Sequence, residues 1–230
     1  MDTRAPDGPA RLTMKLKTGS KREWMGTMVD KPEIDFLLFD LGGVLIDFAG
    51  FEELGPLVPD SPGRKEIRSR WINSKVVQRF ERGHIGPDQF ARGIIGEFQL
   101  TLSADDFIGR FVEWARGPYP GAIELLQGIS QTYPVAALSN SNVLHSPIHR
   151  RGLDGVIDSF YFSDEIGHVK PDRSIFDHVV RDLAVPPEKI AFFDDTTVNV
   201  EAAEELGFAA YCVDGLDALR SQLQTLGLLE

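Results

Sequence analysis

Three short apolar runs of the chain each end in polar residues that could carry out chemistry. The run FLLF is followed by Asp40, a second run ends in Ser139 and Asn140, and a third ends in the acid pair Asp194 and Asp195. A carboxylate at the end of a buried run is unfavourable unless a partner compensates its charge. The sequence therefore raises the question of what partners these acids have.

A lysine and a cation would complete such a site. Lys170 lies in the segment GHVKPD, in a loop before a helix that Pro171 and Asp172 begin. Several carboxylates in one place repel one another unless a cation lies among them, and hard oxygen ligands suit Mg²⁺. A lysine, a hydroxyl and loop N–H groups beside that cation form an anion site for a phosphoryl group. An aspartate there can attack phosphorus and form an aspartyl-phosphate that water later hydrolyses.

Strands and helices alternate along the chain and would position these residues. Short apolar runs predict strands at 34–39, 135–138, 160–162, 190–193 and 208–213, and apolar stripes predict helices at 122–129, 174–183, 199–206 and 216–226. This alternation predicts a doubly wound, mainly parallel, Rossmann-like α/β sheet. Each polar residue alone has an ordinary explanation, such as helix capping. However, strand ends of one parallel sheet converge on one crevice, which brings the polar residues together.

Residues 49–118 interrupt this alternation. They contain no convincing strand, but they show helical patterns at 64–80, 87–98 and 104–115. Pro87 stands at the opening of the second pattern, where its missing N–H is tolerated. We predict that this segment is a small helical cap inserted after the first strand, so that residues 33–48 and 119–230 form the α/β core.

Composition restricts the class of protein. The chain has 230 residues, 42% hydrophobic and 26% charged, which is ordinary for a globular protein with a sizeable core. A formal net charge of −11 argues against nucleic acid as a partner. The single cysteine, Cys212, is compatible with a reducing compartment, and no run of the sequence suits a membrane span or signal peptide, so we expect a cytoplasmic protein. Residues 1–32 are rich in basic and small polar residues without periodicity and are predicted to be a disordered extension.

Four segments of the chain together resemble a known family. FDLGGVLID, LSNSN, GHVKPD and FFDDTTVNVEAAEELG occur in the order and at the spacing of the haloacid dehalogenase (HAD) superfamily of hydrolases. The resemblance covers residues 34 to 215, and the predicted insert stands where members of subfamily IA carry a small cap. The sequences of these segments are similar to those of the branch containing bacterial α-D-glucose-1-phosphate phosphatase and the N-terminal phosphatase domain of soluble epoxide hydrolase.

The resemblance implies a role for each residue of the site. Asp40 corresponds to the nucleophile and a Mg²⁺ ligand, Gly42 to a residue whose carbonyl also binds the metal, and Asp195 to the remaining protein ligand. Lys170 corresponds to a lysine that holds the nucleophile and the phosphoryl group and takes part in catalysis. The phosphate-binding residues implied are Leu41, Gly42, Ser139, Asn140 and Lys170, and the residues implied to orient the metal ligands are Asp194 and Asn199.

Gly42 departs from the family pattern. Most phosphatases of the superfamily have a second aspartate here, which protonates the leaving oxygen and later activates water. Losing a general acid–base typically lowers the rate by roughly 10² to 10⁴. Asp47, His145 and water are candidate replacements for this proton carrier.

The remaining polar and aromatic residues provide weaker functional signals. In the predicted cap, Trp71, Arg82 and His84 are candidates to face the substrate, although each is better explained as a packed or solvated residue. We expect His149 to lie on a helix surface.

Three functions remain open. The first is Mg²⁺-dependent hydrolysis of a phosphomonoester, with a small phosphorylated metabolite such as a sugar phosphate as substrate. The second is a weakly active or non-catalytic sensor or regulator that binds a phosphate ligand. The third is a 2-haloacid dehalogenase-like hydrolase, because those relatives also lack the second acid and attack carbon without a metal. The acid pair at 194–195 argues against the third function, since that chemistry does not require a metal site.

Overall fold

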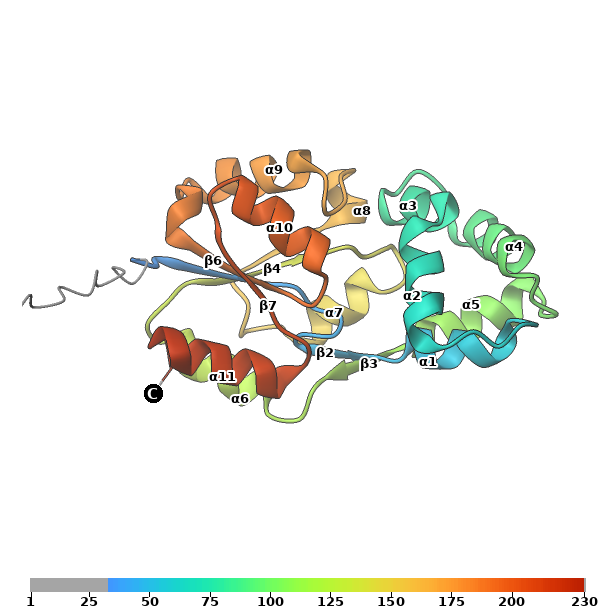
Figure 1. Ribbon diagram of the computed structural model, residues 1–230, viewed down its shortest axis with the longest axis horizontal. Coiled ribbons are helices and arrows are strands. Elements are labelled where there is room, and N and C mark those ends of the chain that lie inside the picture. Colours follow the sequence, from blue (N-terminus) through green and yellow to red (C-terminus); the bar gives the residue numbers. More distant parts are fainter. Residues whose placement is uncertain (1–32, 230) are drawn as a thin grey trace, which may run out of the picture. The chain divides into compact units, whose positions relative to one another are not determined.

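A parallel five-stranded sheet forms the centre of the protein in the computed structural model, which describes residues 33–229 (Figure 1). The extension predicted at residues 1–32 lies outside the described residues. The strands are β1 (Phe36–Phe39), β4 (Val135–Ser139), β5 (Ser159–Phe162), β6 (Ile190–Asp194) and β7 (Ala209–Cys212), in the order β5-β4-β1-β6-β7. Every neighbouring pair runs parallel, which confirms the predicted α/β fold.

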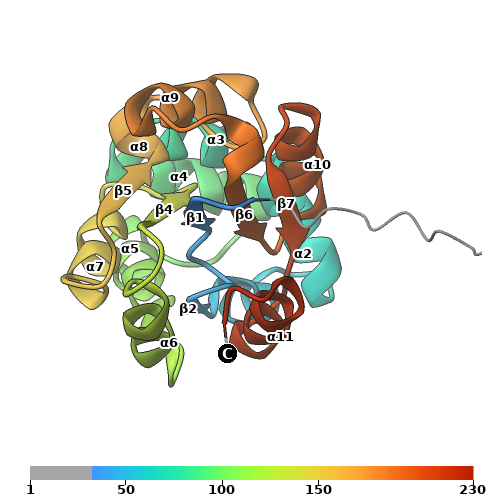
Figure 2. The same cartoon turned by 90° about the vertical axis from the view of Figure 1, so that its left-hand side faces the viewer.

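Helices cover both faces of this sheet (Figure 2). Successive residues of a strand point to opposite faces. Leu37 and Phe39 of β1 therefore pack in one apolar cluster with α6 and α11, whereas Phe36 and Leu38 pack in another with α9 and α10. Burial on both faces explains why the strands read as almost continuous apolar runs. The four helices are α6 (Ala122–Ile129), α9 (Arg173–Leu183), α10 (Thr197–Glu205) and α11 (Leu216–Leu226).

The strand order places a crevice beside β1. The chain continues from β1 to β4 on one side and reaches β6 on the other side, so the order reverses at β1. In sheets of this kind the carboxyl ends of the strands at such a point form a ligand-binding crevice. Asp40, Ser139 and Asp194 stand at or directly after the ends of β1, β4 and β6, so the fold brings them to this edge.

A helical insert follows β1 and has an apolar core of its own. Aromatic residues dominate that core, and the rings of Phe80 and Phe90 are stacked with their centroids 4.0 Å apart. The insert consists of α1 (Gly50–Leu54), a 3-10 turn (Gly55–Leu57), α2 (Arg64–Asn73), α3 (Lys75–Glu81), α4 (Pro87–Phe98) and α5 (Ala104–Glu113). The exact domain boundaries at 48/49 and 118/119 stay a prediction.

Two expectations about the insert are wrong. The pattern at 64–80 predicts one helix, but the helix is interrupted at Ser74, where the backbone is extended. The Ser74 hydroxyl accepts a hydrogen bond from the N–H of Val77 and so caps α3. The expected absence of strands is also wrong, because β2 (Ile46–Phe48) and β3 (Ala115–Pro118) pair as an antiparallel ribbon. The sequence ARGP has little strand propensity, so pairing with β2 and not local preference makes it a strand.

Two further short helices lie outside the insert. The sequence analysis did not predict α7 (Ser146–Gly152) and α8 (Ser163–Ile166), because they are too short to show a clear apolar period.

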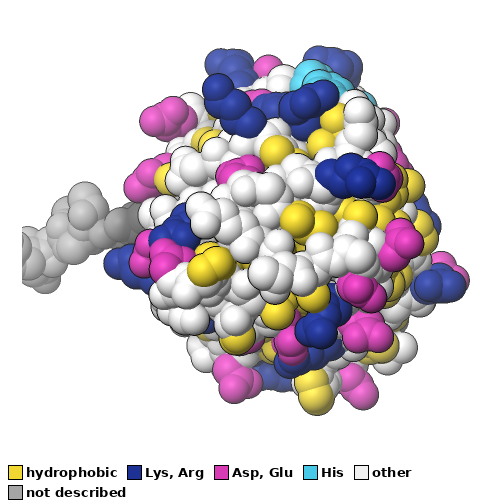
Figure 3. All heavy atoms as spheres, turned by 90° about the vertical axis from the view of Figure 1, so that its right-hand side faces the viewer, with side chains coloured by type: hydrophobic (Ala, Val, Ile, Leu, Met, Phe, Trp, Pro, Cys, Tyr) yellow, Lys and Arg dark blue, Asp and Glu magenta, His cyan; other side chains and the backbone are white. Residues whose placement is uncertain are grey.

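Figure 3 shows the face formed by the insert, where basic and acidic side chains are interspersed with small apolar groups. Between residues 33 and 229, no helix is long and apolar enough to cross a membrane.

Candidate active site

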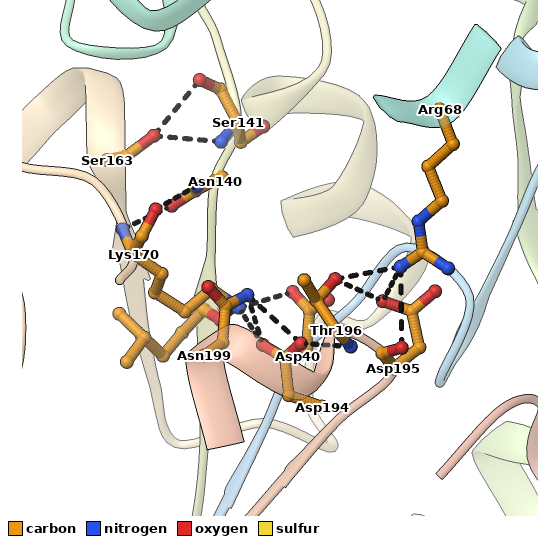
Figure 4. Close-up of polar contacts among 11 residues, drawn as sticks. Asp40, Arg68, Asn140, Ser141, Ser163, Lys170, Asp194, Asp195, Thr196 and Asn199 are labelled. Atoms are coloured by element: carbon orange, nitrogen blue, oxygen red, sulfur yellow. Dashed lines mark hydrogen bonds and ion pairs between the residues drawn. The ribbon is translucent and has the colours of Figure 1, made fainter. Parts of the chain in front are cut away.

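The side chain of Lys170 extends into the crevice toward Asp40 and Asp194 (Figure 4). Its buried Nζ donates hydrogen bonds to Asp194 Oδ2 at 2.6 Å and to the carbonyl of Leu138 at 2.8 Å, and it lies 2.9 Å from Asp40 Oδ1. Burial alone would lower the pKa of Lys170, but the carboxylates of Asp194 and Asp40 outweigh it and raise that pKa. Lys170 is therefore a stable positive charge beside both acids.

Asp40 lies at the end of β1, and one of its two carboxylate oxygens faces Lys170. Its N–H donates to the carbonyl of Phe193 at 2.8 Å, and its Oδ1 faces Lys170. Within the part of the chain that the structure describes, Asp40 Oδ2 has no hydrogen-bond or ion-pair partner. Burial raises the pKa of Asp40 to about 7, with Lys170 opposing the shift and Asp194 adding to it.

The two acids that follow β6 have different environments. Asp194 is fully buried, and both of its oxygens are occupied: Oδ1 accepts from the N–H of Thr196 at 2.8 Å, the amide of Asn199 lies 3.1 Å from each oxygen, and Oδ2 accepts from Lys170. Asp195 Oδ1 pairs with a guanidinium N–H of Arg68 at 2.8 Å and accepts from the Thr196 hydroxyl at 2.9 Å. Its Oδ2 remains available for a further ligand.

The arrangement of oxygens fits a divalent cation. One carboxylate oxygen from each of Asp40, Asp194 and Asp195 lies within 4.8 Å of the others. Oxygens bound about 2.1 Å from one Mg²⁺ are separated by at most about 4.2 Å, which is a similar spacing. Among residues 33–229, the cationic partners of these three carboxylates are Lys170 and Arg68, so a further positive charge is favourable. The free oxygens of Asp40 and Asp195 are suitable ligands, whereas those of Asp194 are occupied.

The glycine pair after Asp40 contains one glycine that the backbone requires and one that it does not. Gly43 has φ +81°, and a Cβ there would lie 2.6 Å from Asp195 Oδ2. At Gly42, φ is not positive, and a Cβ would meet Phe48 Cβ at an ordinary 3.7 Å. The carbonyl of Gly42 accepts no hydrogen bond in the described loops. The absence of a side chain at position 42 is therefore not imposed by lack of space.

We expect Gly43→Ala to destabilise the protein more than Gly42→Ala. An alanine at 43 must adopt a left-handed backbone, at about 1 to 2 kcal/mol, and must also displace Asp195. An alanine at 42 avoids both penalties. Urea unfolding of the two variants measures the difference, and equal stability would contradict this account of the turn.

The groups predicted to bind phosphate lie on the other side of Lys170. The Ser139 hydroxyl is buried at the end of β4 and makes no hydrogen bond to any residue in 33–229. The N–H groups of Leu41 and Gly42 donate to no backbone carbonyl in the described loops. The Asn140 side chain, however, accepts from the N–H of Lys170 at 2.8 Å and donates to its carbonyl at 3.0 Å. Asn140 thus positions the lysine loop, and its contact with phosphate stays a prediction.

Comparison with known proteins identifies the family. A model of the haloacid dehalogenase-like hydrolases matches residues 34–207. The chain belongs to this family. The resemblance noted in the sequence is thereby confirmed at the level of the superfamily, and the assignment to one branch of subfamily IA stays a prediction.

Two relatives and one solved structure illustrate what this haloacid dehalogenase-like hydrolase is similar to. It is 28% identical over 193 residues to D-ribitol-5-phosphate phosphatase of Bacteroides thetaiotaomicron, covering 76% of this chain and 89% of that protein. It is 26% identical over 204 residues to flavin mononucleotide hydrolase 1 of Arabidopsis thaliana, covering 86% and 80%. A HAD-family enzyme from Bacteroides thetaiotaomicron, solved with magnesium and inorganic phosphate, has a TM-score of 0.62 and 25% identity, covering 79% of this chain and 94% of that one.

A cavity of about 720 Å³ lies between the strand ends of this hydrolase and its helical insert. Asp40, Ser139 and Lys170 line it from the core. Its lining from the insert includes Arg68, Trp71, Glu81 and Arg82, whereas His84 lines a separate surface hollow. Sequence reasoning missed Arg68 and Glu81, because charged residues on a short helix are normally solvated and their own segment does not indicate where the helix docks.

The proton carriers considered from the sequence are poorly placed. Asp47 is half-exposed on β2, 3.9 Å from Arg116, and does not line the cavity. His145 is buried, its Nε2–H donates to the carbonyl of Phe111 at 2.7 Å, and burial lowers its pKa to about 4. His149 was expected on a helix surface, which is wrong: it is buried, and its ring lies near those of His145 and Phe162.

Proposed function

We propose that this hydrolase is a Mg²⁺-dependent phosphomonoesterase that acts on a small phosphorylated metabolite, with sugar phosphates favoured. The observation that carries the proposal is the convergence of Asp40, Asp194 and Asp195 within 4.8 Å, with Lys170 bridging the first two. The D-ribitol-5-phosphate phosphatase and the enzyme solved with magnesium and phosphate support it as relatives of similar length.

In this mechanism the core residues bind the phosphoryl group and transfer it to Asp40. The Ser139 hydroxyl, Lys170 and the N–H groups of Leu41 and Gly42 donate hydrogen bonds to the phosphoryl oxygens. The Asp40 carboxylate attacks phosphorus, the bond to the leaving oxygen breaks, and an aspartyl-phosphate forms. Water then attacks phosphorus and restores the Asp40 carboxylate with release of inorganic phosphate.

The remaining polar residues hold this arrangement in place. Asp40, Asp195 and the carbonyl of Gly42 would hold the metal, while Asp194 and Asn199 would orient Lys170 and the turn that carries Asp195. Bound Mg²⁺ supplies positive charge that offsets the negative charge of the phosphoryl group and the carboxylates. Arg68 holds Asp195 in its observed orientation.

Release of phosphate from p-nitrophenyl phosphate tests this function. We expect release in the presence of Mg²⁺, loss of release in excess EDTA, and recovery when Mg²⁺ is restored. Phosphate binding without turnover would favour the regulator, and EDTA-insensitive halide release from a 2-haloacid would favour the dehalogenase. A panel of sugar and polyol phosphates then ranks substrates by kcat/KM.

We expect Mg²⁺ to stabilise the folded chain in a pH-dependent manner. A cation that binds only the folded state stabilises it by about 2.7 kcal/mol at a hundredfold excess over its Kd. The cation must displace the proton of Asp40, whose pKa is raised to about 7. The stabilisation should therefore be largest above that pKa and shrink as the pH falls below it.

Thermal unfolding with and without Mg²⁺, on either side of the pKa of Asp40, measures this effect. Asp195→Asn should remove the Mg²⁺-dependent increase in Tm, whereas Asp154→Asn, at an exposed position outside the cavity, should retain it. An increase in Tm that is independent of pH, or that survives in Asp195→Asn, would contradict this metal site.

A further inference from the structure

A phosphatase of this kind needs a proton for the leaving oxygen, and Gly42 has no side chain to provide it. Asp47 lies outside the cavity, and the Nε2 proton of His145 is already donated to the carbonyl of Phe111. The donor must therefore come from another residue that lines the cavity or from water.

Glu81 is an acid in this cavity without a protein partner. Four carboxylic acids line the cavity: Asp40, Glu81, Asp172 and Asp195. Asp40 pairs with Lys170, and the other two aspartates pair with arginines of the insert. Glu81 is half-buried at the last residue of α3, and no hydrogen bond or ion pair holds its carboxyl group among residues 33–229. Its carboxyl group is therefore free to interact with a substrate.

Two contacts dock the end of α3 on the core and thereby position Glu81. The adjacent Arg82 forms an ion pair with Asp172, which lies two residues after Lys170. At Gly83 the backbone has φ +70° and approaches Asp164 so closely that a Cβ would lie 2.7 Å from its carbonyl oxygen. The turn after Glu81 is thus fixed against the segments that carry the catalytic lysine and α8.

Burial of Glu81 favours its protonated form. Burial raises the pKa of Glu81 to about 8. Lys170 and Arg82 oppose this shift, and Asp40 adds to it. A protonated carboxyl group at neutral pH can donate a proton to a developing alkoxide, and its conjugate base can then accept one from water.

We propose that Glu81 is the general acid and base of this reaction and takes the place of the aspartate absent at position 42. As Asp40 attacks phosphorus and the bond to the leaving oxygen breaks, that oxygen takes the proton of Glu81 and departs as an alcohol. The Glu81 carboxylate then takes a proton from the water that attacks phosphorus. The bond between phosphorus and Asp40 breaks, and Asp40 returns as a carboxylate. This proposal rests on the proposed phosphatase function.

Leaving-group dependence tests the proposal in the full chain. An alkoxide leaving group needs a proton from the enzyme, whereas p-nitrophenolate is weakly basic and departs without one. We expect Glu81→Gln to lower kcat/KM for a polyol phosphate by about 10²-fold and for p-nitrophenyl phosphate by less than about threefold. The ratio kcat/KM is used because it covers the steps through departure of the leaving group and excludes later hydrolysis of the aspartyl-phosphate.

Matched variants separate the role of Glu81 from general damage. Glu113→Gln makes the same change at an exposed position of α5 outside the cavity and should leave both substrates unaffected. Glu81→Asp keeps a carboxyl group and should retain more activity on the polyol phosphate than Glu81→Gln. Equal losses on both substrates, no loss on the polyol phosphate, or equal losses in the two Glu81 variants would overturn the proposal.

The same assay distinguishes this inference from the proposed function. Wild-type protein that releases no phosphate from either substrate would contradict the phosphatase function itself. Wild-type protein that hydrolyses both, together with a Glu81→Gln variant of unchanged leaving-group preference, would leave the function standing and reject Glu81 as its proton donor.

Discussion

Asp40→Asn is expected to lower phosphate release by about 10⁴-fold or more, because it removes the nucleophile on which the covalent intermediate forms. The amide has nearly the same shape as the carboxylate and can still accept a hydrogen bond from Lys170. Its nitrogen and neutral oxygen cannot form an aspartyl-phosphate. Steady-state release of phosphate from p-nitrophenyl phosphate, with saturating Mg²⁺, measures the loss.

The stability of Asp40→Asn distinguishes a chemical effect from unfolding. Burial raises the pKa of Asp40 to about 7, so ionisation of this group lowers the stability of the folded, metal-free state as the pH rises toward and through that value. A neutral asparagine avoids this loss, and the variant should be at least as stable as the wild type above pH about 7. Asp47→Asn, on β2 and outside the cavity, should retain activity. Residual turnover near the wild-type rate in Asp40→Asn would reject Asp40 as the nucleophile.

Lys170→Met is expected to reduce both activity and stability. The side chain of Lys170 is 1% exposed and compensates Asp40 and the fully buried Asp194. Removing one partner of a buried ion pair typically lowers stability by about 3 to 5 kcal/mol, because the remaining charge is uncompensated. Loss of its positive charge next to the phosphoryl group should also lower kcat/KM by roughly 10³-fold.

The pH dependence of that stability loss provides a second readout. Lys170 opposes the rise in the pKa of Asp40, so without the lysine the folded-state pKa of Asp40 rises further above its unfolded value. The variant should therefore lose stability as the pH rises and approach the wild type as the pH falls and Asp40 becomes protonated. Urea unfolding at acidic and neutral pH measures this trend, with Lys75→Met at an exposed position of α3 as the control. A loss that does not change with pH would contradict the assignment of Lys170 as the compensating charge.

Glu81 changes how the glycine at position 42 is interpreted. From the sequence alone, Gly42 appears as a missing proton carrier, and the enzyme would then need a good leaving group or a regulatory role. In the structure, a carboxyl group from the insert faces the same cavity, so the acid can come from a different segment of the chain. Substrates with poor leaving groups therefore remain compatible with the proposed chemistry.

The sequence by itself determined the α/β core and which residues gather at its edge. The three inner strands β1, β4 and β6 are buried on both faces, so each leaves a local apolar signal, as in the runs that lead to Asp40 and Asp194. Parallel topology then requires that the ends of neighbouring strands share one crevice. Prediction succeeded here because the signal is local and the topological rule is general.

Only the tertiary structure decided how the insert completes the cavity. The break at Ser74, the pairing of β2 with β3 and the docking of Arg82 on Asp172 depend on contacts between segments far apart in the chain. These contacts aim Glu81 and Arg68 at the crevice, although both residues stand in helices whose own sequences would place them equally well in solvent. Side-chain direction there depends on long-range packing, and no local period of the sequence encodes it.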